Sequence, residues 1–210
     1  MIIALDTAST DVSLALARAD GSPIGTIAWS GDRRQGHETL PRLLELLRAH
    51  HADLADTFAV TVGTGPGSFT GLRVGMSLAK GLALVLSRPL VGVPSLEAWL
   101  HSEPDARAAL ARAGARDAFI LLRGEGDARI VDRDELPDEA RTATVVAPAE
   151  LAEAFGLSGA LSPQRAAQSI AVLAVKRLGT HPAGDDLERL EPAYLRAPRG
   201  LGQLAGDGGA

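Results

Sequence analysis

Residues 58–86 read FAVTVGTGPGSFTGLRVGMSLAKGLALVL, and this stretch decides the fold class. The apolar run from Phe58 to Val62 is typical of a strand, and the sequence GTGPG at 63–67 ends it. Ser68 can then cap a long helix that runs to about Leu86. The stretch therefore predicts a strand, a glycine-rich turn and a helix in succession.

The flanking segments predict further strands and helices. Apolar runs and alternating patterns indicate strands at 2–5, 12–16, 24–29 and 90–93, with the hairpin signal Asp20-Gly21 between the second and the third. Leu40, Leu43, Leu44 and Leu47 recur at helical spacing between His37 and His51, and Pro41 fits if it lies in the first turn. Another helix starts near Ser95. The order β-β-β-α-β-α-β predicts an α/β fold with a mixed sheet and helices on its faces, the ribonuclease-H-like core of actin, sugar kinases and heat-shock ATPases.

The second half of the chain predicts a smaller lobe. We expect a helix over 107–113, strands at 119–122, 129–131 and 143–146, and a helix from Ser162-Pro163 to Leu178. The expected domains are a first lobe over residues 1–100, a second lobe over 101–198, and a glycine-rich, disordered tail over 199–210. The sequence shows no internal repeat.

Composition narrows the function classes. The 210 residues include no cysteine, which excludes disulfides and thiolate metal sites. The net charge of −5 argues against a chain that grips nucleic acid alone, because phosphate contacts need clustered Lys and Arg. No run approaches the roughly 20 apolar residues of a membrane helix, and the N-terminus does not resemble a signal peptide. We expect a soluble, cytoplasmic protein that contacts no membrane.

The glycine-rich turn admits two interpretations. It could bind phosphate at the helix N-terminus, or it could be a tight turn that permits close packing. It is not a Walker A loop, because no Gly-Lys-Ser/Thr closes it, and Ser68 stands where the dinucleotide fingerprint has its third glycine. Within the helix, Gly67, Gly71, Gly75 and Ala79 form a small-residue stripe at four-residue spacing. The stripe could pack on the protein's own sheet or receive another chain.

Several polar residues are candidates for chemistry. Asp6 ends the first strand, where actin-like ATPases hold the metal of their nucleotide, although an aspartate there can also simply form a turn. His37, His50 and His51 lack any zinc-binding pattern. Ser68, His37 and Asp6 could be combined into a nucleophile triad, but no G-x-S-x-G elbow supports it.

The segment GPGSFTGLR is a specific signature that resembles the TsaB family, formerly YeaZ. IIALDTAST at the N-terminus, GHETLPRLLELL at 36–47, GVPSLEAWL at 92–100 and PAYLR at 192–196 support the resemblance. The match is dense over residues 1–100, sparse across 101–190, and returns at Pro192. The family consists of bacterial accessory subunits for threonylcarbamoyladenosine formation on tRNA.

The resemblance implies a two-lobed, actin-like fold and a role without catalysis by this chain alone. The chain would support the related catalytic subunit TsaD, with the ATPase TsaE joining the assembly, and would form a homodimer when TsaD is absent. ATP and metal are expected on the partner subunits, and tRNA contacts only through the complex. The first two helices would form the interface, whose candidate residues are Leu40, Leu43, Leu44, Leu47, Gly71, Gly75 and Ala79.

One comparison within the resemblance bears on mechanism. The catalytic paralogue has a His-x3-His metal pair after its fifth strand, and the matching positions here are Ser95 and Trp99. Serine and tryptophan cannot replace a pair of imidazole ligands. The resemblance therefore implies no catalytic, metal or cofactor residues in this chain. The alternatives are a free-standing ATP-using kinase or acyltransferase of the same fold, or a peptidase.

Overall fold

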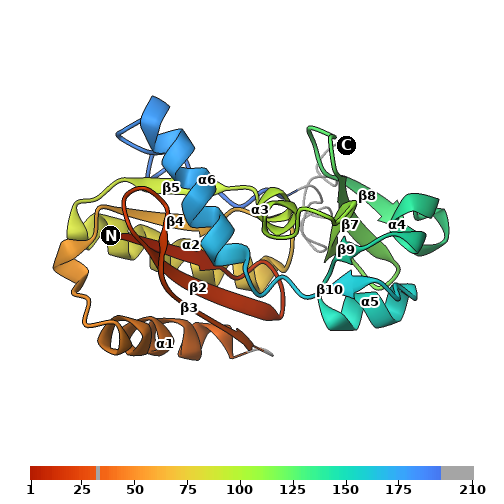
Figure 1. Cartoon of the computed structure of the whole chain (residues 1–210), viewed down its shortest axis with the longest axis horizontal. Coiled ribbons are helices and arrows are strands. Elements are labelled where there is room, and N and C mark those ends of the chain that lie inside the picture. The colour runs from red at the N-terminus through yellow and green to blue at the C-terminus, as the bar shows by residue number, and fades with distance from the viewer. Residues whose placement is uncertain (32–33, 195–210) are drawn as a thin grey trace, which may run out of the picture.

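A computed structural model describes residues 1–31 and 34–194, which fold into two five-stranded sheets with helices around them (Figure 1). The tail expected at 199–210 lies outside the described residues. The first sheet has the strand order β3-β2-β1-β4-β5. Its strands are β1 (Ile2–Asp6), β2 (Asp11–Ala17), β3 (Pro23–Ser30), β4 (Ala59–Gly63) and β5 (Leu90–Val93). β1, β2 and β3 pair antiparallel, whereas β4 pairs parallel with β1 and β5 parallel with β4. The strands predicted for residues 1–100 are confirmed.

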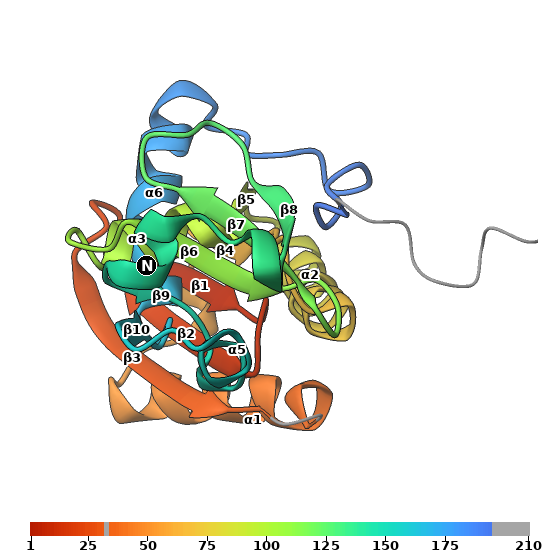
Figure 2. The ribbon, with the colours of Figure 1, turned by 90° about the vertical axis from the view of Figure 1, so that its right-hand side faces the viewer.

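Helices cover both faces of the first sheet. One face packs on α1 (Gln35–Ala49) and α2 (Phe69–Leu86), and the short 3-10 helix η1 (Leu54–Asp56) lies between them in sequence. The opposite face packs on a helix from the end of the chain, α6 (Ala166–Thr180), as Figure 2 shows. Ser68 is the N-cap of α2, as predicted, because its Oγ accepts a hydrogen bond from Gly71 N at 3.2 Å. α1 begins two residues earlier than expected, so Pro41 lies inside the helix rather than in its first turn.

The second sheet repeats the topology of the first. Its order is β10-β9-β6-β7-β8, with an antiparallel meander followed by two parallel strands. The strands are β6 (Ala108–Arg112), β7 (Asp117–Leu122), β8 (Arg129–Asp132), β9 (Val145–Val146) and β10 (Ala160–Leu161), and η2 (Arg133–Glu135), α4 (Asp138–Thr142) and α5 (Ala149–Phe155) connect them. The structure therefore contains a duplicated fold that the sequence did not show, because the second copy has much shorter elements.

The segment 107–113, expected to be a helix, is instead strand β6. Alanine has the highest helix propensity, and the stretch AALAR misled the prediction for that reason. β6 is the central strand of the second sheet and pairs with both β7 and β9. Tertiary pairing therefore outweighs the local preference.

Each sheet is followed in sequence by a helix that packs on the other lobe. α3 (Ser95–Ser102) follows the first sheet, and its Leu96, Trp99 and Leu100 join one apolar core with residues of the second sheet. α6 (Ala166–Thr180) follows the second sheet, yet Ile170 and Ala174 pack on the first sheet, across which Figure 1 shows the helix running. The helix expected in the second lobe thus covers the first lobe, because its apolar side faces the free face of that sheet. It also starts at Ala166, later than the predicted Ser162.

Contrary to the expectation from the apolar runs, α2 has the length and hydropathy of a membrane-spanning helix, with a mean hydropathy of 1.4 over 18 residues, and it is the one such helix within residues 1–31 and 34–194. One of its sides, which includes Leu72, Met76 and Ala83, is buried in the protein core. Core helices pass the same test of length and composition.

Candidate functional site

The candidate site is the buried Asp6 at the end of β1. Its side chain is fully buried and accepts two hydrogen bonds from α3: Trp99 Nε1 donates to Oδ2 at 2.6 Å, and Ser95 Oγ donates to Oδ1 at 3.0 Å. The Ser95 hydroxyl also accepts a hydrogen bond from Gly65 N at 3.1 Å. These contacts join β1, the glycine-rich turn and α3. We call Asp6, Ser95 and Trp99 the Asp6 network.

Burial dominates the electrostatics of Asp6. Desolvation raises the pKa of its carboxyl from the ordinary 3.8 to about 6, although the hydrogen bonds from Trp99 and Ser95 oppose the rise. Even with two donors, a charged carboxylate in a fully buried position costs free energy. The free energy of unfolding therefore depends on pH through the ionisation of Asp6.

The Asp6 network does not fit a metal or nucleotide site. Each carboxylate oxygen, which would have to face a cation, already accepts a hydrogen bond from Trp99 or Ser95. The turn leaves no spare room, because a Cβ on Gly63 would collide with Asp6 Oδ1 and lie 2.6 Å from Ser95 Oγ. Asp6 is thus neither a free metal ligand nor a simple turn former. It is the acceptor that ties three segments together.

The glycine-rich turn uses its backbone donors internally. Thr64 N bonds to Val93 O at 2.8 Å, Gly65 N to Ser95 Oγ, and Ser68 N to Ala8 O at 2.7 Å. A Cβ on Gly67 would collide with Ala8 O. Of the two interpretations of this turn, the geometry supports close packing against the Asp6–Ala8 segment, because a phosphate would need these N–H groups to be free.

The space between the lobes is a packed apolar core. Ala8 and Leu72 from the first lobe, Trp99 from α3 and Phe119 from the second sheet belong to one cluster of buried side chains. Trp99 has no exposed surface. Buried side chains therefore fill the space where these parts of the two lobes meet.

The small-residue stripe of α2 packs inside the chain. A Cβ on Gly71 would collide with Thr7 O, and one on Gly75 would collide with Thr7 Oγ1. Thr7 Oγ1 donates to Gly71 O at 2.7 Å, which places this side chain against the helix backbone. Ala79 is fully buried in the same core. The interpretation of the stripe as a surface for another chain is corrected: the backbone that approaches it is the protein's own β1–β2 connection.

α1 divides the predicted interface leucines between core and surface. Leu43 and Leu47 are 0% and 4% exposed and belong to the core beneath α1 and α2. Leu40 is 41% exposed, and Leu44 is half-buried. Only Leu40 and Leu44 of the seven predicted interface residues therefore reach the surface, because the other five line the side of each helix that faces the sheet.

The remaining sequence candidates do not assemble into a site. His37, His50 and His51 lie exposed along and just after α1, where His50 packs over Gly25. Within residues 1–31 and 34–194, no group of three metal-ligating side chains forms. The Ser68 hydroxyl caps α2, and neither it nor Asp6 bonds to His37 in that part of the chain.

Residues 182–194 form a strap that returns along the first lobe. Asp185 Oδ2 accepts from Gly92 N at 2.7 Å, so the strap covers the edge strand β5. Farther along, Ala193 N bonds to Thr64 O at 2.8 Å, and the side chain of Leu190 fills the space over Gly92. The strap thus brings Pro192–Tyr194, the described part of the PAYLR motif, to the glycine-rich turn, an association that sequence spacing could not predict.

The sequence identified Ser95 and Trp99 as the positions that match the histidine pair of the catalytic paralogue. It did not reveal the hydrogen bond that each side chain donates to Asp6. The signal was present: a buried aspartate needs donors, and an indole N–H and a hydroxyl stood on one helix one turn apart.

A family model described as "TsaD: tRNA N6-adenosine threonylcarbamoyltransferase" matches residues 33–185. The chain is 38% identical over 95 residues to the tRNA threonylcarbamoyladenosine biosynthesis protein TsaB of Escherichia coli, and 34% identical over 96 residues to that of Bacillus subtilis. These alignments cover 45% and 46% of this chain, and 40% and 42% of the relatives. The chain thus spans less than half the length of the curated relatives it matches.

The solved structure of YeaZ from Pseudomonas aeruginosa has the same fold. It superposes with a TM-score of 0.70 at 22% identity and covers 92% of this chain and 99% of its own. The two-lobed, ribonuclease-H-like fold and the resemblance to TsaB are both confirmed. Because the family model spans most of the sequence, the chain belongs to the TsaD family of tRNA N6-adenosine threonylcarbamoyltransferases, with TsaB proteins among its relatives.

Proposed function

We propose that this chain is a non-catalytic subunit that supports a TsaD-like catalytic subunit in threonylcarbamoylation of the tRNA adenosine beside the anticodon. The observation that carries the proposal is the Asp6 network, in which Trp99 and Ser95 occupy both carboxylate oxygens. The names of the TsaB relatives support a role in tRNA threonylcarbamoyladenosine biosynthesis. A chain of this family with a filled site contributes something other than the chemical step.

The outer sides of α1 and α2 are the proposed contact surface for that partner. Leu40 is 41% exposed on α1, and Val85 is 82% exposed on α2. Leu44, Val74 and Leu78 are half-buried on the same two helices. We call these five residues the helix face. Exposed apolar side chains gain roughly 25 cal/mol per Å² when a partner covers them.

The resemblance to TsaB extends the same proposal to the rest of the assembly. A TsaE-like ATPase joins the complex, ATP and metal reside on the partner subunits, and tRNA binds through the complex. The net charge of −5 favours this division, because a protein that binds tRNA alone needs many cationic contacts. Without its partner, the chain forms a homodimer through the helix face. We place the protein in the cytoplasm, where tRNA is modified.

The alternative functions receive less support from the geometry. A kinase or acyltransferase of this fold would need a nucleotide site between the lobes, where Trp99 and Phe119 pack instead. A peptidase would need a base beside its nucleophile, and Ser68 is committed to capping α2. ATP or peptide turnover by the isolated chain would favour these functions over the proposal.

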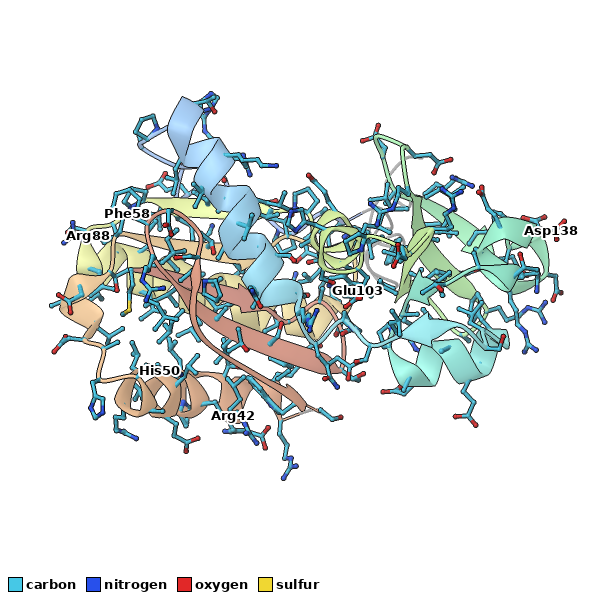
Figure 3. All side chains as sticks on the ribbon, in the orientation of Figure 1. Arg42, His50, Phe58, Arg88, Glu103 and Asp138 are labelled. Atoms are coloured by element: carbon cyan, nitrogen blue, oxygen red, sulfur yellow. The ribbon has the colours of Figure 1, made fainter. Side chains whose placement is uncertain are left out.

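Capture by a tagged TsaD-like paralogue tests the proposal. We expect the wild-type chain to be captured, and the double variant Leu40→Glu/Val85→Glu to be lost while its Tm stays near the wild-type value. Phe58→Glu is the matched control, because Phe58 is 46% exposed but lies before β4 (Figure 3). Failure of the wild-type chain to be captured would overturn the partnership. Capture of the double variant would overturn only the location of the contact.

A further inference from the structure

Three side chains form an exposed cluster where α2 begins. The rings of Phe69 and Tyr194 are 5.4 Å apart and inclined by 42°. The Arg73 guanidinium lies 3.8 Å from the Phe69 ring centre, and Arg73 Nε donates to Tyr194 Oη at 3.1 Å. Phe69 and Tyr194 are each 39% exposed. We call Phe69, Arg73 and Tyr194 the stacking cluster.

The cluster stands out in a chain that uses few aromatic residues. Only 3% of the residues are aromatic, and Trp99, Phe119 and Phe155 are buried in the cores. Phe58 is exposed as well, but Phe69 and Tyr194 form the aromatic pair of the described residues. Leaving 39% of each of these two residues exposed forgoes part of the burial free energy that such side chains gain in a core. A partly exposed aromatic pair contributed by a helix and the strap therefore points to a ligand that stacks on it.

The cluster is held in place by its surroundings. Phe69 and Arg73 lie one turn apart on α2, whose start is capped by Ser68. Tyr194 is fixed at the end of the strap, next to the Ala193–Thr64 backbone hydrogen bond. A surface whose rings are already oriented loses little conformational entropy when a planar group stacks on it.

The charge of Arg73 is available to a ligand. Its guanidinium forms no ion pair with a carboxylate in residues 1–31 and 34–194, whereas Arg116, Arg129 and Arg177 each do. Its Nε donates to Tyr194 Oη, and among the described residues its two Nη groups form no further hydrogen bond to the protein. A guanidinium beside two rings combines stacking with donors for a base edge or a phosphate.

We propose that the stacking cluster is a subsite for one unpaired base of the RNA substrate, an inference that rests on the proposed function. Sequence-specific RNA recognition targets unstacked bases in loops, which stack on aromatic side chains and on arginine planes. Stacking does not require a broadly positive surface, so it is compatible with the net charge of −5. The subsite adds to the affinity of the complex for tRNA, and the other subunits still supply the remaining tRNA contacts.

The test uses the complex of this chain with its TsaD-like partner and a fluorescent anticodon stem-loop RNA at 0.15 M salt. We expect Phe69→Ala and Tyr194→Ala each to raise the Kd about 5- to 150-fold, the range reported for loss of one stacked base. Phe69→Tyr and Tyr194→Phe, which keep the rings, should stay within about 3-fold of wild type. Phe58→Ala and Arg88→Ala are matched controls at the other end of α2 (Figure 3), and we expect no change from them.

A second measurement locates the contact directly. In a stem-loop with 5-bromouridine at the unpaired positions, ultraviolet irradiation should cross-link a base to Tyr194 or Phe69, as identified by mass spectrometry. An unchanged Kd with intact partner capture would overturn the inference and leave the proposed function standing. Loss of partner capture by the alanine variants would also overturn it, because the cluster would then be a protein contact. A wild-type complex that binds no RNA would overturn the proposed function itself.

Discussion

Substitution of Asp6 by asparagine should change how stability depends on pH. The carboxyl is fully buried, and burial raises its pKa from 3.8 to about 6, with Trp99 and Ser95 as hydrogen-bond donors. Asparagine has nearly the same shape, and its amide oxygen can still accept from Trp99 Nε1. Asp6→Asn therefore removes the ionisation while it keeps the packing of the network.

The direction in which stability changes with pH follows from proton binding by Asp6. Between pH 4 and 6 the folded protein holds a proton on Asp6 that the unfolded chain has released, so the wild-type stability falls as the pH rises through this window. A rise in pKa from 3.8 to about 6 lowers the free energy of unfolding of the wild type by about 3 kcal/mol once Asp6 is ionised. The full loss is present above pH 7, and none of it is present below pH 3. Asp6→Asn has no carboxyl to ionise and therefore does not lose this stability as the pH rises.

The assay is guanidinium unfolding of both proteins from pH 3.5 to 7.5. We expect the free energy of unfolding of Asp6→Asn, relative to wild type, to increase by about 3 kcal/mol across the series, because all other groups cancel in the difference. Asp20→Asn is a control of opposite sign, since hydrogen bonds from Ser22 hold the pKa of the exposed Asp20 below its ordinary value. Parallel curves for Asp6→Asn and wild type would refute the assignment of a buried, ionisable Asp6.

Three further predictions concern the same region. Gly75→Ala should lower the free energy of unfolding by about 1–3 kcal/mol because its Cβ would meet Thr7 Oγ1, whereas Gly81→Ala, with nothing within 4 Å, should raise it by up to about 1 kcal/mol; equal effects in chemical denaturation would show that the stripe is not packed. Trp99→Phe should cost about 2 kcal/mol or more and steepen the pH dependence, because Asp6 loses its closer donor; a variant as stable as wild type would contradict the network. Ser68→Ala should lower the Tm through the loss of about 1 kcal/mol of helix capping, and an unchanged Tm would mean that the cap contributes nothing.

The first lobe was predictable because its signals are local. Alternating strands, the Asp20-Gly21 hairpin and the Ser68 cap each depend on residues close together in sequence, and the structure has all of them. The small-residue stripe at Gly71 and Gly75 was also visible, but its partner was not. The approaching backbone belongs to Thr7, more than 60 residues away, and spacing within a helix does not reveal what packs on it.

The second lobe and the site depended on long-range contacts. The alanine-rich 108–112 segment has helical propensity, and only its position between β7 and β9 makes it a strand. The exchange of α3 and α6 between lobes follows from which sheet faces remain uncovered, a property of the assembled fold. Asp6 was identified as a candidate, but its role is set by Trp99, 93 residues away.

The most direct measurement of the central claim is reconstituted modification of an unmodified tRNA by the TsaD-like and TsaE-like subunits, with ATP, threonine-derived substrate and this chain added or omitted. We predict threonylcarbamoyladenosine only when the chain is present, with full activity from a Ser95→Ala variant, because in the proposed function the chain supplies a partner surface and no catalytic group. Equal modification without the chain would contradict its role as a required subunit. Threonylcarbamoyladenosine formed by this chain without the TsaD-like subunit would contradict the claim that its own site is filled and silent.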